Sequence, residues 1–182
     1  CELPNSIELI GGENIVVKNC QLGAQPTGIT CKVQEVNKLS FINNQVYPDG
    51  RENLVLDACN NCVIEGNNFK SYYNGILVLN GNDNTVNKNI FWLTGAVQNQ
   101  LLDHGDDFGI INVKGNNNMV TSNSLSCEWA YAGAVTVNAV QGTGNVFKNC
   151  FVDNLESYRV FLVNAQTEVS NCVSSDKVSI VE

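Results

Sequence analysis

The sequence predicts an all-β protein, a right-handed parallel β-helix (solenoid) of about seven coils, and three observations support this fold class. A short phrase recurs in which an apolar residue, two spacers, an asparagine, one spacer and a second apolar residue follow each other. Short β-branched runs bounded by Gly and Asn precede the phrases, and they are too short for helices. A unit that holds only short strands cannot bury its apolar face alone, so its copies must stack.

The asparagine slots set the period of the repeat. Successive slots lie 22 to 26 residues apart, with one step of 34 between Asn89 and Asn123. Asparagine tolerates unusual backbone angles at a bend, and its amide can bond the equivalent amide one coil away. We therefore expect a structural asparagine ladder. The phrases are Val17-Cys20-Leu22, Phe41-Asn44-Val46, Ile64-Asn67-Phe69, Val86-Asn89-Phe91, Val120-Asn123-Leu125, Val146-Asn149-Phe151 and, more weakly, Val169-Cys172-Ser174.

A second short strand is expected ahead of each phrase, and six such runs are visible, the first of them before the phrase at Phe41. These runs are rich in Val, Ile and Leu and are bounded by turn residues. They are GITCKV (28–33), NLVLDA (53–58), GILVLN (75–80), GIINVK (109–114), GAVTVN (133–138) and VFLVNA (160–165).

Length and charge narrow the possible functions. The 182 residues, 43% of them hydrophobic, predict a single domain over 1–182. The net charge of -8 disfavours nucleic acid and anionic membranes as partners, and a neutral partner fits better. No apolar run is long enough to span a bilayer, and the start, CELPNSIELIGG, has neither a signal peptide nor an initiator Met. We expect a mature product or a piece of something longer.

The eight cysteines could form a secreted disulfide scaffold or serve as small apolar residues. Disulfide-dense folds are short chains without a proper core, so we expect mostly free, buried thiols here. Cys59 and Cys62 form a CxxC, but there is no second CxxC and His104 is the only histidine. A zinc site therefore lacks ligands, and we expect no metal and no cofactor.

The long step of the repeat marks an inserted loop at 92–108. It contains FWLTGAVQNQLLDHGDDFG and gathers Trp92, Asp103, His104, Asp106 and Asp107. Loops on a rigid solenoid are where function or subunit contact is placed. A solvated acidic loop is the alternative.

In order along the chain, these features resemble the inulin fructotransferases and the related difructose-anhydride hydrolases. The resemblance runs from about Ile7 to the end, and it includes the CxxC and the acidic insertion. The segments that carry it are YPDGRENLVLDACNNCVIEGNNF (47–69), SYYNGILVLNGNDNTVNKNIF (71–91), GDDFGIINVKGNNNMVTSNSL (105–125) and GTGNVFKNC (142–150).

The resemblance implies a homotrimeric β-helix with active sites between subunits. Such enzymes cleave the β(2→1) fructosyl linkage of inulin, as a lyase that releases a cyclic difructose dianhydride, or hydrolyse the dianhydride. Matching IELIGG places the general acid/base at Glu8. The partner carboxylate of the family would fall before Cys1, so we expect further amino-terminal coils or a companion chain, and no turnover by this chain alone.

Taken from the residues alone, Glu8 has two readings. Alternation in Ile7, Glu8 and Leu9 would point its side chain outward. The repeat register instead puts it in an apolar column with Leu77 and Ile111, a setting that would suit a proton donor.

Five further residues are candidates for sugar contacts, because aromatic faces and charged hydrogen-bonding groups suit neutral hydroxylated rings. A non-catalytic carbohydrate-binding or assembly module is the alternative function; ice binding would need a Thr-rich ladder that the sequence lacks. We expect an extracellular protein, with a cytoplasmic one as the alternative. The five candidates are Arg51, Tyr72, Tyr73, Asp106 and Asp107.

Overall fold

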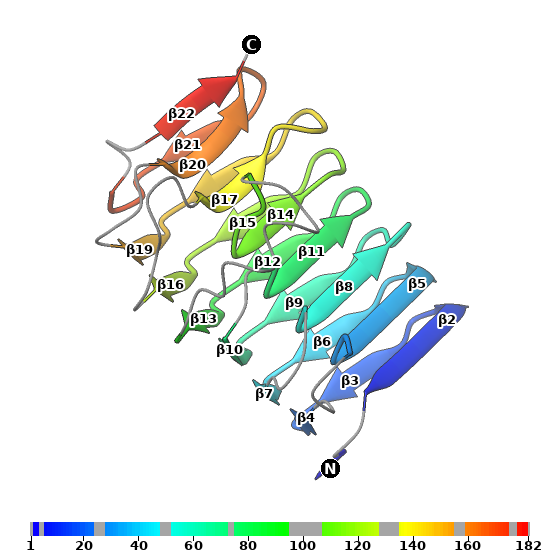
Figure 1. Cartoon of the computed structure of the whole chain (residues 1–182). Coiled ribbons are helices and arrows are strands. Elements are labelled where there is room, and N and C mark those ends of the chain that lie inside the picture. The colour runs from blue at the N-terminus through cyan, green and yellow to red at the C-terminus, as the bar shows by residue number, and fades with distance from the viewer. Residues whose placement is uncertain are drawn as a thin grey trace.

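The computed structural model describes residues 2–3, 6–23, 28–47, 52–72, 75–94, 107–127, 135–154, 159–174 and 178–181. Every strand pairing in these ranges is parallel and joins one coil to the next, as Figure 1 shows. The described residues contain no helix, and hence none that could span a membrane. The expected parallel β-helix is confirmed.

Three sheets run along the rod, and each coil contributes one strand to each sheet in the order I, II, III. Sheet I contains β2 (Ile7–Glu13), β5 (Cys31–Asn37), β8 (Leu54–Asp57), β11 (Leu77–Asn80), β14 (Ile111–Val113), β17 (Val135–Ala139), β20 (Arg159–Asn164) and β22 (Val178–Val181). Sheet II contains β3 (Val16–Lys18), β6 (Ser40–Ile42), β9 (Val63–Glu65), β12 (Thr85–Asn87), β15 (Met119–Thr121), β18 (Val146–Lys148) and β21 (Glu168–Ser170). Sheet III contains β1 (Glu2–Leu3), β4 (Gln21–Gly23), β7 (Gln45–Tyr47), β10 (Asn68–Ser71), β13 (Ile90–Leu93), β16 (Ser124–Cys127) and β19 (Phe151–Asn154).

The coil count is close to the expected seven. Within the described ranges there are six coils with all three strands, a seventh represented by β20 and β21, and β22 in sheet I beyond it. The recurring phrase of the sequence spans a corner: its first apolar residue lies in sheet II, its asparagine in the turn, and its second apolar residue in sheet III. Each coil thus has three strands where the sequence suggested two runs.

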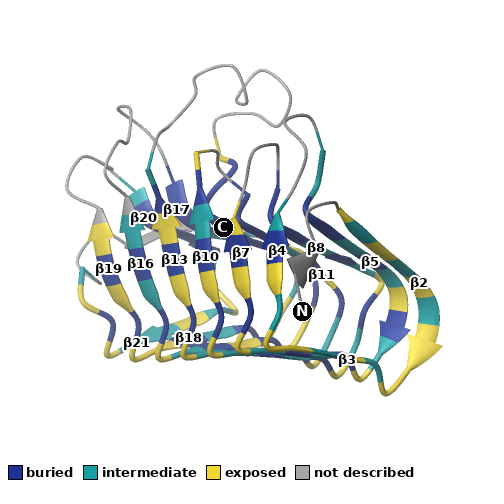
Figure 2. Cartoon of the chain, turned by 90° about the horizontal axis from the view of Figure 1, so that it is seen from below, coloured by how far each residue is buried: buried dark blue, intermediate teal, exposed yellow. Residues whose placement is uncertain are grey.

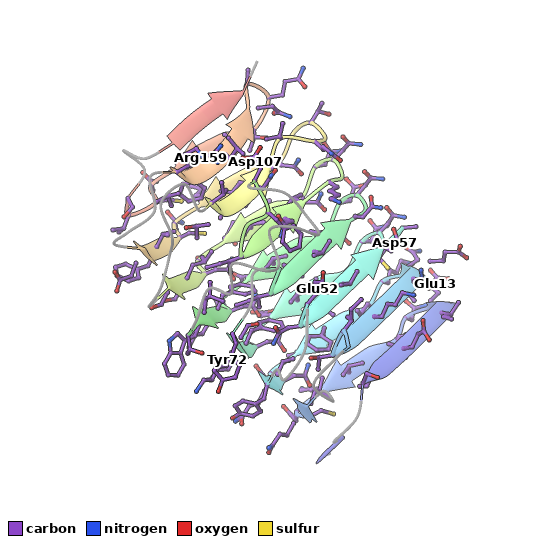
Figure 3. All side chains as sticks on the ribbon, viewed as in Figure 1. Glu13, Glu52, Asp57, Tyr72, Asp107 and Arg159 are labelled. Atoms are coloured by element: carbon purple, nitrogen blue, oxygen red, sulfur yellow. The ribbon has the colours of Figure 1, made fainter. Side chains whose placement is uncertain are left out.

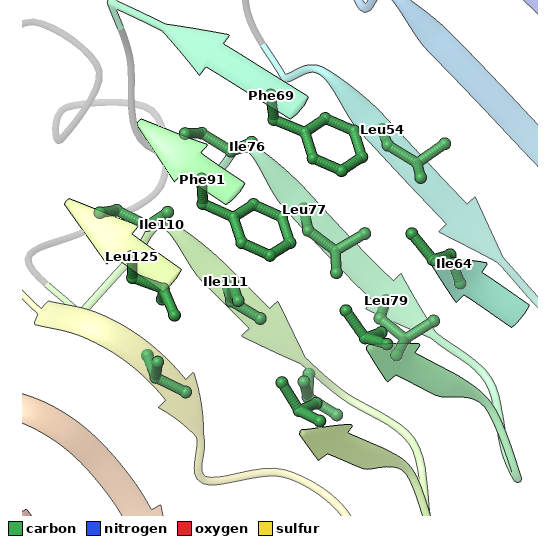
Figure 4. Close-up of a cluster of buried hydrophobic side chains, with 14 of the residues drawn as sticks. Leu54, Ile64, Phe69, Ile76, Leu77, Leu79, Phe91, Ile110, Ile111 and Leu125 are labelled. Atoms are coloured by element: carbon green, nitrogen blue, oxygen red, sulfur yellow. The ribbon is translucent and has the colours of Figure 1, made fainter. Parts of the chain in front are cut away.

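Inward side chains from the three sheets form one continuous core. The rings of Phe41, Phe69 and Phe91 stack along the rod, with centroids 6.2 Å and 5.0 Å apart. Figure 4 shows Phe69 and Phe91 packed against Leu54 and Leu77 of sheet I. Outward positions alternate with these buried ones along each strand, which gives the banding in Figure 2.

A buried asparagine ladder runs between sheets II and III, as expected. Each amide nitrogen donates to the amide oxygen one coil further on, at 3.1 Å from Asn44 to Asn67, 2.9 Å from Asn67 to Asn89 and 3.0 Å from Asn89 to Asn123. Each of these oxygens also accepts the backbone N–H of the preceding ladder residue. Because all these groups are buried, the bonds satisfy polar atoms that would otherwise destabilise the fold.

Two corrections concern this corner. The unusual backbone angle belongs to the residue before each ladder position, since Asn43, Lys88 and Ser122 have positive φ. In the sixth coil the ladder residue is Cys150, whose N–H donates to the Cys172 sulfur at 3.4 Å, and Asn149 is the positive-φ turn residue. Either asparagine or cysteine can occupy the ladder position. Only the strand register of the structure shows which residue is in the ladder and which is the positive-φ turn residue.

A second buried ladder, which the phrase did not include, lies between sheets I and II. It joins Asn84, Asn118 and Asn145 through the same pairs of bonds. The run from Asn116 to Asn118 is therefore explained residue by residue: Asn116 bonds Asn82 on the surface, Asn117 has positive φ, and Asn118 is in the ladder.

Candidate functional site

The connections that vary most in length join sheet III to sheet I. β7 ends at Tyr47 and β8 begins at Leu54, whereas β13 ends at Leu93 and β14 begins only at Ile111. The expected insertion at 92–108 falls on this connection. Its first residues extend β13, and residues 95–106, with Asp103, His104 and Asp106, lie outside the described ranges.

A polar pocket of about 170 Å³ lies where this connection re-enters the rod, over β14 and β17. Its floor comes from Asn112 and Asn138, at outward positions of β14 and β17. Lys114 and Gln141 contribute from the turns that follow these strands, and the wall comes from the segment that leads into β14. The lining residues are Asp107, Phe108, Asn112, Val113, Lys114, Asn138 and Gln141.

Two floor amides hold the wall in place. Asn112 accepts the N–H of Gly109 at 2.9 Å and donates to the carbonyl of the same residue at 2.8 Å. Asn138 donates to the backbone carbonyl of Asp107 at 2.6 Å. The polar strand residues thus fix the backbone of 107–109, and a preorganised wall costs less entropy when a ligand binds.

The charged groups of the pocket carry both signs. The carboxylate of Asp107 pairs with Arg159 at 2.8 Å, and Figure 3 labels the two side by side. Lys114 and Gln141 are exposed, and their side chains make no hydrogen bond or ion pair in the described part of the chain. These groups can both donate hydrogen bonds to a hydroxylated ligand and accept them from it.

Glu8 lies on the outer face of β2, and its column differs from the expected one. It pairs with Lys32, whose column continues through Val55 and Val78. Leu77 and Ile111 belong instead to the inward column of Ile7. The prediction from alternation was correct and that from the repeat register was wrong by one residue, which is enough to change the face of the sheet.

The surroundings of Glu8 are therefore polar. Its side chain is 54% exposed, and its Oε1 lies 3.2 Å from the ammonium of Lys32. Four strand spacings separate β2 from β14 in sheet I, or roughly 19 Å. The structure does not bring Glu8 and the Asp107 pocket together.

Of the other candidates, Tyr72 is 45% exposed directly after β10, and it does not line the pocket. Arg51, Tyr73 and Asp106 lie outside the described residues. Of the predicted site residues that lie in the described ranges, only Asp107 lines the pocket.

Several residues of the site were not predicted. Asn112 sits in the middle of the apolar run GIINVK, and that lone polar residue was the available signal. Glu52 does not line the pocket, but nothing in the sequence indicated that this acidic residue is buried, at 6% exposed. A Cβ on Gly75 would lie 2.5 Å from the Phe108 ring and 3.1 Å from the Glu52 Cγ, so these two side chains fill the space over that glycine.

Most described cysteines are free, as expected. Burial raises the pKa of the Cys59 and Cys62 thiols, and raises that of Cys31 to about 12. Cys20 departs from the expectation because it is disulfide-bonded. The free thiols are Cys31, Cys59, Cys62, Cys150 and Cys172.

Comparison with known families gives one match. The family model described as "Periplasmic copper-binding protein (NosD)" matches residues 3–170. No curated protein matches the sequence.

Solved structures of DFA-IIIase from Arthrobacter chlorophenolicus A6 share the fold. The C387A mutant in complex with DFA-III is 20% identical, with a TM-score of 0.75 over 94% of this chain and 48% of that one. The enzyme in complex with GF2 is 20% identical, with a TM-score of 0.70 over 88% and 45%. The chain spans less than half the length of these structures, and at this identity the likeness concerns the fold.

Proposed function

Because the chain belongs to the NosD family and has the β-helix fold of DFA-IIIase, we propose that it is a fructan-active protein. Its ligand is a neutral fructose-containing saccharide, of the kind represented by inulin, GF2 or DFA-III. The finer proposal is cleavage of the β(2→1) linkage with cyclisation to a difructose dianhydride, or hydrolysis of such a dianhydride.

The single observation that carries this proposal is the polar pocket beside Asp107. It combines a paired carboxylate, an amine and amides on a rigid strand floor, and it lies at the irregular corner of the solenoid. Hydroxylated rings are recognised by groups of this kind, placed so that they both donate and accept. A neutral ligand also agrees with the net charge of -8, which would repel an anion.

For the reaction, we propose Glu8 as the general acid/base, at a position of its own that lies roughly 19 Å along sheet I from the Asp107 pocket. Glycoside chemistry requires two carboxyl groups on opposite sides of the scissile bond. Glu8 would donate its proton to the leaving glycosidic oxygen, and Lys32, at 3.2 Å, would hold the carboxylate in position between turnovers.

A non-catalytic carbohydrate-binding or assembly module is the second candidate. The observation that favours it is the exposed, ion-paired state of Glu8, which differs from the apolar setting of a typical proton donor. In this case the pocket would bind saccharide, and replacement of Glu8 would leave every measured property unchanged.

Copper, which the family description names, does not fit the described residues. Copper(I) prefers soft thiolate and thioether ligands, and copper(II) prefers imidazole. The described thiols are buried in the core, and no three His, Cys, Asp or Glu side chains gather in the ranges that the structure describes. The proposed reaction therefore does not involve copper.

The proposed function also includes an extracellular location and a homotrimeric assembly. The disulfide of Cys20 supports an extracellular protein, because disulfides persist in oxidising compartments. We propose a homotrimer formed through the sides of the rod, and sedimentation of the 19.8 kDa chain as a stable monomer would contradict it.

Calorimetric titration with GF2 and DFA-III tests binding, and chromatography of products from inulin and DFA-III tests turnover. Lys114→Ala should weaken binding about tenfold, as expected for a lost hydrogen bond to a charged group. Lys148→Ala, an exposed lysine on sheet II, is the matched control and should bind normally.

Glu8→Gln separates the two candidates, since glutamine keeps the shape but cannot transfer a proton. Loss of turnover with unchanged binding supports the enzyme. Because the partner carboxylate is proposed to come from further coils or a companion chain, turnover is measured in a protein that includes them. Binding without turnover in both of those proteins supports the module, and no binding of any saccharide by the wild type rejects the proposed function.

A further inference from the structure

The outer face of sheet III carries exposed aromatic rings in its middle coils. Tyr47 on β7 is 39% exposed and Trp92 on β13 is 36% exposed. Between them lies Lys70 on β10, which pairs directly with Trp92 and, by the register of β10 on β7, lies opposite Tyr47. We call these three residues, together with the neighbouring outward amides of Gln45 and Asn68, the aromatic strip.

Both rings are held by their neighbours. The hydroxyl of Tyr47 donates to the side-chain oxygen of Gln45 at 2.8 Å. The ammonium of Lys70 lies 4.5 Å from the centroid of the Trp92 ring, within range of a cation–π contact. Rings that are already ordered lose little conformational entropy when a ligand binds, so this face is preorganised.

The charge of sheet III distinguishes it from the other two sheets. From β4 to β16 its described strands contain no carboxylate, whereas sheet I carries Glu8 and Asp57 and sheet II carries Glu65. In a chain with eighteen acidic residues the strands from β4 to β16 carry no charge except that of Lys70, and the carboxylates of sheet III lie beyond them, at Glu2 on β1 and Asp153 on β19. Tyrosine and tryptophan rings next to amide groups suit a partner that presents apolar C–H faces and hydroxyl groups together.

We propose that the aromatic strip binds an extended neutral polysaccharide, aligned with the axis of the rod, as a second saccharide site separate from the Asp107 pocket. The two rings are two coils apart, or roughly 10 Å along that axis. A chain of sugars could therefore contact both rings at once, while Gln45 and Asn68 bond its hydroxyls. This proposal rests on the proposed function for its ligand class, inulin, but on different residues.

Affinity electrophoresis through gels that contain inulin tests the strip. The wild type should be retarded, and Tyr47→Ala and Trp92→Ala should each weaken the retardation about tenfold, the size expected for one lost aromatic contact. Met119→Ala is the matched control, an exposed apolar residue on sheet II, and it should migrate like the wild type. Since all three side chains are exposed, the variants should fold normally.

The same variants are titrated with GF2, which separates failure of the strip from failure of the pocket. Retardation that both strip variants weaken, with GF2 binding unchanged, supports the proposal. Retardation that neither variant alters overturns it. A wild type that binds GF2 but migrates freely through inulin overturns the strip and leaves the proposed function standing.

Two further outcomes are decisive. If inulin retards the wild type through the strip but GF2 does not bind, the strip is supported and the pocket proposal fails. If Tyr47→Ala or Trp92→Ala turns an oligomer into a monomer in sedimentation without altering retardation, a second copy of the chain covers this face and the proposal is overturned.

Discussion

The turns from sheet II to sheet III repeat almost unchanged from coil to coil, whereas the connections from sheet III to sheet I differ in length and content. At the regular corner a positive-φ residue such as Lys88 is followed by a buried amide such as Asn89. At the irregular corner Asp107 belongs to the segment that leads into β14 and forms the wall of the pocket. At the corner between sheets II and III, every coil must hydrogen-bond the buried polar groups of its neighbours. The connections from sheet III to sheet I do not have to meet this requirement and can therefore vary.

The two corners should therefore respond differently to substitution. Changes at the regular corner and in the core beneath it should reduce the stability of the whole rod. Changes at the irregular corner should alter ligand binding at a smaller cost in stability. Three predictions test this difference, and a fourth concerns an ion pair at the turn from sheet I to sheet II. They run from the largest expected effect to the smallest.

Phe69→Ala should lower the free energy of unfolding by about 3–5 kcal/mol, because it leaves a cavity between the Phe41 and Phe91 rings. Urea denaturation measures the loss. Phe151→Ala, an exposed phenylalanine of the same sheet, is the control and should change stability by less than about 0.5 kcal/mol. Equal losses of unfolding free energy in the two variants would show that the stacked Phe41, Phe69 and Phe91 rings are not part of the stabilising core.

Asn89→Ala should cost about 2–3 kcal/mol. It leaves the Asn67 amide and the Asn123 oxygen buried without their ladder partner. The neighbouring exposed residue Asn68 provides the control, since Asn68→Ala should be nearly neutral. A neutral Asn89→Ala would mean that the ladder bonds add nothing to stability.

Asn112→Ala should cost about 1–2 kcal/mol, because the backbone of Gly109 loses both of its bonds to that amide. Its effect on GF2 binding should exceed that of Asn89→Ala in samples that remain folded. Calorimetry and denaturation on the same preparations check both statements. Normal GF2 binding by Asn112→Ala would show that the Asn112 bonds to the wall are not needed for ligand binding.

The smallest effect concerns pH. The hydrogen bond and positive charge of Lys38 lower the pKa of Glu13 below its ordinary value of 4.5. A depressed folded-state pKa contributes stability that is present above the unfolded value and lost as the pH falls through the folded value. Lys38→Gln should therefore reduce stability slightly at pH 7 and not at all at pH 2, and an equal effect at both values would contradict the assignment.

The fold could be predicted from the sequence because the same physical demand recurs in every coil. Asn44, Asn67 and Asn89 occupy equivalent turns, so the period was visible without any structure. Errors of one residue arose where two residues of a turn look alike, as at Asn149 and Cys150, and where Glu8 was assigned to the column of Leu77.

The pocket could not be predicted in the same way, because it depends on contacts that occur once. Asn112 and Asn138 are outward strand positions, and only the fold of 107–109 over them turns their amides into the floor of a site. Asp107 was noticed because acidic residues cluster there. Lys114 and Gln141 carried no signal, since lone polar residues at outward positions are usually solvated.

Titration of GF2 into the wild type and Lys114→Ala, with Lys148→Ala as control, tests most directly whether the pocket beside Asp107 is a saccharide site. The account predicts saturable binding by the wild type and the control, and about tenfold weaker binding by Lys114→Ala at unchanged stability. Equal affinity in all three proteins, or no binding by the wild type, would contradict it.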